Sequence, residues 1–311
     1  MEELLRLFPI GLREVLRNSR LEKEKLQEIR LRINGPCMIR YENQEYFIKE
    51  QGGITTEAKS AYVVCGKEIK EIMEFVSNYS MYAYEEEIKH GFLTIPGGHR
   101  VGIVGKAVIE HGELKILKQI GFLNIRIAHE VKGCESMLLP HLYLAGEWGH
   151  TLLFSPPGCG KTTMLRDLIR LLSDGTVFCA GKKIGVVDER SELAACYMGC
   201  PQNDVGIRTD VLDCCPKSQG IPLLLRSMSP QIIAVDEIGT KEDIAALRYA
   251  IGCGVKLLMT AHAGSFTELA NRPYFKEFVE ERVIERYVQL GMIGGKCGVH
   301  TIYDKQGKQI W

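Results

Sequence analysis

The first half of the chain changes its hydrophobic period several times. Leu12, Val15 and Leu16 recur at helical spacing between charged neighbours, and the pattern then alternates apolar with polar residues in the manner of a strand. A second helix is expected at residues 67–78, and strands are expected at residues 28–34, 38–48, 91–105 and 123–127. This mixture predicts a smaller α+β domain over residues 1–144, with a docking or regulatory role.

The second half is more regular, because short apolar strands alternate with helical segments. The strands are expected at residues 151–154, 184–187, 232–235 and 257–260. Each is bounded by glycine, proline or polar residues, as expected of strands in a parallel sheet that is covered on both faces. Residues 145–311 are therefore predicted to form an α/β domain with a parallel sheet.

Composition indicates where such a protein works. Lys plus Arg and Asp plus Glu number 39 each, so no net field favours nucleic acid or an anionic membrane. No apolar stretch approaches the roughly 20 residues that cross a bilayer, so we expect membrane contact only through partners. The acidic start Met1-Glu2-Glu3 does not read as a signal peptide, and the eleven cysteines then indicate a reducing, cytoplasmic compartment.

Four of the cysteines lie close together in the sequence. Cys196 and Cys200 are followed by Cys214 and Cys215, with no histidine among them. The spacing matches no standard zinc site, so we expect buried, small apolar side chains here rather than metal ligands.

The clearest chemical signal is a phosphate-binding loop at residues 154–163, which read Phe-Ser-Pro-Pro-Gly-Cys-Gly-Lys-Thr-Thr between a strand and a helix. Glycines let backbone N–H groups turn toward phosphates, the helix N-terminus adds positive potential, and Lys161 reaches the β and γ oxygens of ATP. Ser155 departs from the pattern, which expects glycine there. The residues predicted to bind ATP are Ser155, Pro156, Pro157, Gly158, Cys159, Gly160, Lys161, Thr162 and Thr163.

An apolar strand at residues 232–235 ends in Asp236 and Glu237. Asp236 and Thr162 are predicted to bind Mg²⁺, and Glu237 is predicted to polarise the attacking water. Acidic residues are also common where a strand simply ends in solvent. The phosphate loop upstream in the sequence favours the catalytic interpretation.

Two further strand ends carry weaker signals. Residues 185–192 read Gly-Val-Val-Asp-Glu-Arg-Ser-Glu, so Glu189 or Glu192 is a candidate to orient water and Arg190 to contact phosphate, with a surface ion cluster as the alternative. His262 follows the last expected strand and is a candidate sensor of the γ-phosphate, with a structural role as the alternative.

The order of these motifs resembles that of the secretion ATPases of type II and type IV systems, and more closely that of the stage III sporulation protein AA family of endospore-forming bacteria. The segments that carry the resemblance are the phosphate loop, Asp188-Glu189-Arg190, residues 224–230, Val235-Asp236-Glu237, Thr260-Ala261-His262, and residues 28–32, 82–85, 98–102 and 124–127. The resemblance covers essentially the whole chain. It departs at Asp236, where the secretion enzymes often have glycine.

The resemblance implies a RecA-like P-loop ATPase core and a homo-oligomeric ring, expected as a hexamer. It also implies membrane-embedded partners in a channel between mother cell and forespore, a place in the mother-cell cytoplasm, and a histidine-box role for His262. In such rings an arginine from the N-terminal domain or a neighbouring subunit completes the site. The candidates are Arg100, Arg126, Arg208 and Arg226, with Arg126 and Arg100 preferred.

Together these features favour a Mg²⁺-dependent ATPase that powers or assembles a secretion-like complex. A RecA-like core also serves nucleic-acid translocases and helicases. The neutral charge balance and the lack of a basic, aromatic stripe argue against nucleic acid. A nucleotide-gated scaffold with little turnover is the third possibility, and the presence of Glu237 argues against it.

Overall fold

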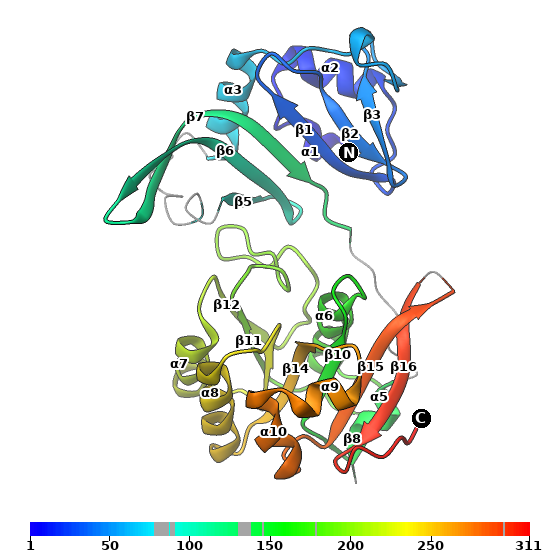
Figure 1. Ribbon diagram of the computed structural model, residues 1–311, viewed down its shortest axis with the longest axis vertical. Helices are drawn as coiled ribbons and strands as arrows, with labels where there is room; N and C mark the ends of the chain where they lie inside the picture. The colour runs from blue at the N-terminus through cyan, green and yellow to red at the C-terminus, as the bar shows by residue number, and fades with distance from the viewer. Residues whose placement is uncertain (78–86, 88–90, 130–137, 145, 178, 295) are drawn as a thin grey trace. The chain divides into compact units, whose positions relative to one another are not determined.

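The computed structural model describes residues 1–77, 87, 91–129, 138–144, 146–177, 179–294 and 296–311 (Figure 1). The chain divides into two compact units, Met1–His129 and Glu130–Trp311. This boundary precedes the one expected near Leu144, because Leu139 and Leu142 pack into the core of the second unit. The resemblance segment at residues 82–85 lies outside the described residues.

The first unit is built on a sheet with the strand order β4-β3-β2-β1-β7-β6-β5. Its elements are α1 (Glu2–Leu5), α2 (Ile10–Asn18), β1 (Leu26–Arg32), β2 (Met38–Tyr41), β3 (Gln44–Ile48), β4 (Ile54–Thr55), the 3₁₀ turn η1 (Ala58–Ser60), α3 (Gly66–Val76), β5 (Phe92–Ile95), β6 (His99–Glu110) and β7 (Glu113–Arg126). All the strand pairs are antiparallel.

The alternation of the strands separates two faces of this sheet. Ile29 on β1 and Ile125 on β7 are buried partners in register, and they share a core with the apolar faces of α2 and α3. The alternate positions point to the other face, where Arg100 on β6 lies directly opposite Arg126 on β7. An α+β unit is therefore confirmed.

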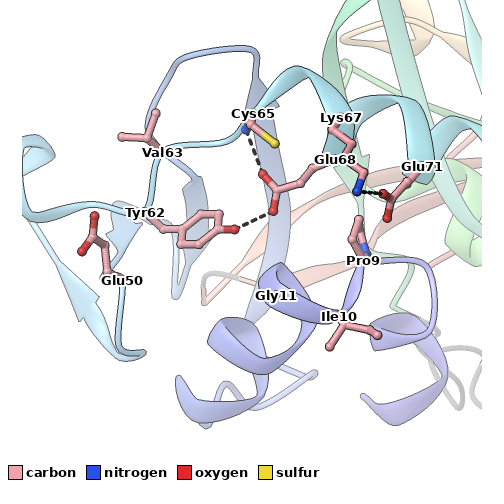
Figure 2. A pocket seen from close by; sticks show the side chains of 10 residues that line it. All are labelled: Pro9, Ile10, Gly11, Glu50, Tyr62, Val63, Cys65, Lys67, Glu68 and Glu71. Carbon is pink, nitrogen blue, oxygen red and sulfur yellow. Dashed lines mark hydrogen bonds and ion pairs between the residues drawn. The ribbon is translucent and has the colours of Figure 1, made fainter.

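A pocket of about 730 Å³ opens in the first unit, where α2 and α3 begin (Figure 2). The buried Glu68 crosses its wall, accepting hydrogen bonds from the Tyr62 hydroxyl at 2.5 Å and from the Cys65 backbone N–H at 2.8 Å. Cys65 is the N-cap of α3, so this carboxylate fixes the start of that helix. None of the predicted site residues lines the pocket.

The second unit has a sheet with the strand order β12-β11-β13-β14-β10-β15-β16. Its elements are α5 (Leu139–Leu142), β8 (Tyr143–Leu144), β9 (Glu147–Trp148), β10 (Thr151–Ser155), α6 (Lys161–Asp174), β11 (Ile184–Asp188), β12 (Thr209–Asp213), α7 (Lys217–Ser227), β13 (Ile232–Val235), α8 (Lys241–Gly252), β14 (Lys256–His262), α9 (Phe266–Asn271), α10 (Pro273–Glu280), β15 (Arg286–Ile293) and β16 (Lys296–Asp304). In the order of the sheet, each strand from β12 through β11, β13, β14 and β10 to β15 runs parallel to its neighbour. Strand β16 pairs antiparallel to β15.

Apolar side chains cover both faces of this sheet. Leu153 on β10 packs with α6 in one core, whereas Leu152 and Phe154 pack with α7 and α8 in the other. All residues of β10 are buried, as expected of a central strand. The carboxyl ends of β10, β11, β13 and β14 therefore meet at one edge of the sheet, where α/β folds place their ligands.

No helix among the described residues is long and apolar enough to span a bilayer.

Candidate active site

The phosphate loop connects the end of β10 to the start of α6. Gly158 and Gly160 have φ angles of 76° and 73°, in the left-handed region that favours glycine. A Cβ built on Gly160 would lie 2.6 Å from the Sγ of Cys297, so this position has room only for glycine. A Cβ built on Gly158 would meet nothing within 4 Å, which leaves the centre of the loop open.

Lys161 is the first residue of α6, and its side chain folds back into the loop. Its Nζ donates to the backbone oxygens of Ser155 at 3.2 Å and Pro156 at 3.1 Å, and contacts the Nδ1 of His262 at 3.0 Å. Burial lowers the pKa of Lys161, while the carboxylates of Asp236 and Glu237 oppose that shift. The ammonium is therefore held by neutral acceptors, which a phosphate group can replace.

Thr162 and Asp236 meet beside this lysine, although 74 positions separate them in the chain. The Thr162 Oγ1 donates to the Asp236 Oδ2 at 2.6 Å, and the Thr260 Oγ1 donates to the Asp236 Oδ1. Burial raises the pKa of Asp236, and the two hydroxyl donors oppose that shift.

A hydroxyl and a carboxylate side by side are the hard oxygen ligands that suit Mg²⁺. Among the described residues, no group of three or more His, Cys, Asp or Glu side chains can hold a metal ion. The donor set at Thr162 and Asp236 therefore fits an ion that also takes ligands from phosphate and water.

Glu237 follows Asp236 in a left-handed backbone conformation, with φ of 51°. Its backbone N–H donates to the Thr260 Oγ1 at 2.8 Å, which fixes this unusual turn. Its carboxylate lies 2.9 Å from the Nε2 of His262 and 2.6 Å from the Nη1 of Arg190. Since the Nδ1 of His262 accepts from the Lys161 ammonium, the Nε2 carries the proton that is donated to Glu237.

The candidates that follow β11 have different partners in the structure. Arg190 forms an ion pair with Glu237, whereas Glu189 forms an ion pair with Lys217 on α7. The backbone N–H of Glu192 donates to the Asp188 Oδ1 at 2.8 Å.

The arginine candidates lie in different surroundings. Arg208 donates to the backbone oxygen of Ser173 at 2.9 Å, at the end of α6 remote from the phosphate loop, so its role there is structural. Arg226 lies in the last turn of α7. Arg100 lies over the ring of Phe92, 4.6 Å from its centroid, and Arg126 is largely exposed, both in the first unit.

Sequence reasoning misses two residues of this site. Thr260 contacts both Asp236 and Glu237, and its signal is the two-residue spacing from His262, which places both side chains on one side of β14. Cys297 contacts the loop from β16, and no local pattern indicates it.

The four clustered cysteines do not share one environment. Cys196 is buried as expected, and Cys215 is partly buried. Cys200 and Cys214 are exposed, so the expectation of buried apolar side chains is wrong for these two.

Known structures share this fold. The ATPase DotB from Legionella pneumophila has a TM-score of 0.55 and 14% sequence identity, over 90% of this chain and 77% of that chain. The pilus retraction motor PilT, solved with bound ADP, has a TM-score of 0.60 and 12% identity, over 90% of this chain and 79% of that chain. The likeness to these two structures confirms the RecA-like P-loop fold that the sequence predicts.

The particular family follows from the sequence comparison. The chain belongs to the family described as Sporulation stage III, protein AA, whose model matches residues 1–310. Stage III sporulation protein AA of Bacillus subtilis (strain 168) is 41% identical over 313 residues, which cover 100% of this chain and 97% of that protein. The resemblance to this family is therefore confirmed.

Proposed function

We propose that this chain binds ATP with Mg²⁺ and hydrolyses it at the carboxyl edge of the second sheet. The observation that carries this proposal is the 2.6 Å contact between Thr162 and Asp236, directly beside Lys161. It unites the loop that recognises phosphate with the strand end that binds metal. The ADP in the PilT structure supports nucleotide as the ligand of this fold.

Binding begins with an exchange of partners at Lys161. Its Nζ leaves the backbone oxygens of Ser155 and Pro156 for the β and γ oxygens of ATP, and loop N–H groups at the start of α6 complete the cradle. Because these acceptors are neutral and the phosphate is charged, the exchange favours nucleotide.

Thr162 and Asp236 hold the metal. Mg²⁺, when bound, neutralises charge on the β- and γ-phosphates. The Asp236 carboxylate is partly buried, so a divalent cation held there would offset the cost of its charge and favour its deprotonated form. Thr260 holds the second carboxylate oxygen of Asp236 and thereby sets the direction of the first.

Glu237 positions the attacking water. Its carboxylate already accepts from the Nε2 of His262 and from Arg190, which fixes its orientation in the absence of nucleotide. In the working site, His262 keeps this orientation while the free edge of the carboxylate accepts a proton from water. Glu189 is a weaker candidate for this task, since its ion pair with Lys217 directs it toward α7 rather than toward Lys161 and His262.

The N-terminal unit supplies an arginine. Arg100 and Arg126 lie directly opposite each other, which brings two positive charges together at this end of β6 and β7. Glu28, also opposite Arg126, has an oxygen 3.8 Å from the Arg126 Nε. We expect one of the two arginines to contact nucleotide in the assembled ring. The test is the double variant Arg100→Ala, Arg126→Ala. If its turnover and assembly are unchanged, the N-terminal unit acts only as a docking module.

The family supports a role in sporulation. In our proposal the chain assembles as a hexameric ring in the mother-cell cytoplasm, contacts the membrane only through embedded channel components, and binds no nucleic acid. Its turnover powers or assembles that channel.

The test joins turnover with assembly. Phosphate release and oligomeric mass are measured for the wild-type chain and for Lys161→Ala, with and without a non-hydrolysable ATP analogue. We expect Mg²⁺-dependent release and nucleotide-dependent assembly in the wild type only, because the variant loses the one flexible cation of the loop. Equal turnover in the two proteins contradicts the assignment of the loop. Binding without release points instead to a nucleotide-gated scaffold.

A further inference from the structure

Two cysteines meet at the phosphate loop from distant parts of the chain. Cys159 lies between the two glycines of the loop, and Cys297 lies on β16. The Sγ of Cys297 contacts the backbone oxygen of Cys159 and occupies the space where any side chain at position 160 would lie. Both cysteines are partly exposed.

This contact brings the two cysteines close together. A disulfide joins Cα atoms about 4.4–6.8 Å apart, and the Cys297 sulfur contacts the main chain of Cys159. The Cys159 Sγ lies 3.9 Å from the backbone oxygen of Pro157, within the loop. A bond to Cys297 requires this sulfur to turn away from Pro157 by a change of χ1, and side-chain rotations of this kind are fast.

We propose that Cys159 and Cys297 form a thiol modification site that closes to a disulfide in the presence of oxidised glutathione. One cysteine thiolate attacks glutathione disulfide, which forms a mixed disulfide and releases one glutathione thiolate. The second cysteine thiolate attacks the cysteine sulfur of that mixed disulfide and displaces the second glutathione. Overall, two protein thiols lose two protons and two electrons, and one glutathione disulfide becomes two glutathione molecules.

The bond has a direct consequence for the loop. Backbone N–H groups from Gly158 to Lys161 must turn toward phosphate, and a bond from Cys159 to β16 fixes the middle of this segment. Lys161 directly follows Gly160, and its side chain folds back into the same loop. We expect the oxidised loop to lose nucleotide affinity by more than about tenfold, because the phosphate cradle depends on the loop's conformation. This consequence rests on the proposed function, whereas formation of the bond does not.

The experiment treats the full chain with glutathione disulfide and maps its cysteines by mass spectrometry without reduction. We expect a Cys159–Cys297 peptide that dithiothreitol removes and that forms more slowly with Mg²⁺ and ATP present. Binding of a fluorescent ADP analogue, measured on the same samples, falls in step with this peptide and returns on reduction.

Two variants make the result specific. In Cys297→Ser, Cys159 retains a bound glutathione and no cross-linked peptide forms. Cys253→Ser, which changes an exposed cysteine at the end of α8, cross-links like the wild type. A wild-type chain in which Cys159 remains a thiol or a glutathione adduct overturns the proposal. A chain that cross-links but never binds nucleotide supports the thiol pair and overturns the proposed function.

Discussion

Lys161 and His262 are joined by a 3.0 Å contact between the lysine Nζ and the imidazole Nδ1. The opposite nitrogen of the same ring lies 2.9 Å from Glu237. One imidazole therefore connects the residue that is proposed to bind phosphate with the residue that is proposed to position water. If ATP draws Lys161 away as proposed, the Nδ1 of His262 loses its donor and can accept a hydrogen bond from water instead, so we expect occupancy of the loop to affect Glu237 through this ring.

We expect His262→Asn to separate binding from chemistry. Asparagine is too short to bridge Lys161 and Glu237, so nucleotide affinity is retained while turnover falls on the order of tenfold to a hundredfold, as for a residue that orients a general base. Phosphate release and analogue binding measured on one preparation provide the check. Normal turnover in this variant would leave His262 with a structural role only.

Thr260 gives a second prediction, because its hydroxyl holds two residues at once. Thr260→Val keeps the shape but removes the donor to Asp236 and the acceptor for the Glu237 N–H. Unfolding free energy should fall by about 1–3 kcal/mol, the usual cost of unsatisfied buried groups. A higher Mg²⁺ concentration should be needed for half-maximal turnover.

Thr260→Ser is the matched control, since it restores the hydroxyl and removes one methyl group. We expect it to recover the Mg²⁺ dependence of the wild type. If valine leaves that dependence unchanged, the hydroxyl acts only in packing.

The strands of the second unit show how far local patterns reach. The expected strands at residues 151–154, 184–187, 232–235 and 257–260 are confirmed as β10, β11, β13 and β14. Strand β12 is not predicted, because Thr209–Asp213 has only two apolar residues. A strand at the edge of the sheet needs no more apolar residues than that. Strand β15 forms by pairing with β10, and β16 forms by pairing with β15. A short stretch of sequence does not contain this information.

The candidate site divides in the same way. Two short, contiguous motifs contain Lys161, Thr162, Asp236 and Glu237. Residue type and spacing within these motifs are enough to predict their chemistry. The role of Thr260 depends on β14 lying between β13 and β10, which is a property of the sheet order. The ion pair of Glu189 with Lys217 likewise depends on how α7 packs, so its sequence neighbours do not reveal it.

We expect the free energy of unfolding to depend on pH because of Asp213. Burial raises its pKa from 3.8 to about 6, and its Oδ1 has no hydrogen-bond partner among the described residues. The folded chain therefore binds this proton more tightly than the unfolded chain, so stability declines as pH rises from about 4 through about 6. Asp213→Asn removes the decline and should add about 1–2 kcal/mol near neutral pH and nothing near pH 4.

Urea unfolding of the second unit at several pH values tests this expectation. Asp210→Asn, an exposed change on the same strand, is the control and should leave the pH profile as it is. A profile that Asp213→Asn does not flatten contradicts the assignment of the decline to Asp213.

Glu237→Gln separates the water-positioning role from nucleotide binding. Glutamine keeps the shape and still accepts from His262, but it no longer takes a proton from water, so phosphate release should fall by about 10²- to 10⁴-fold. Lys161, Thr162 and Asp236 are unchanged, so binding of Mg²⁺ and ATP survives and any ring assembled with ATP should persist. Glu189→Gln is the matched control, because its ion pair with Lys217 directs it elsewhere, and it should turn over normally. If Glu237→Gln hydrolyses ATP at the normal rate, the water is positioned by another acid, and Glu189 and Glu192 become the residues to change next.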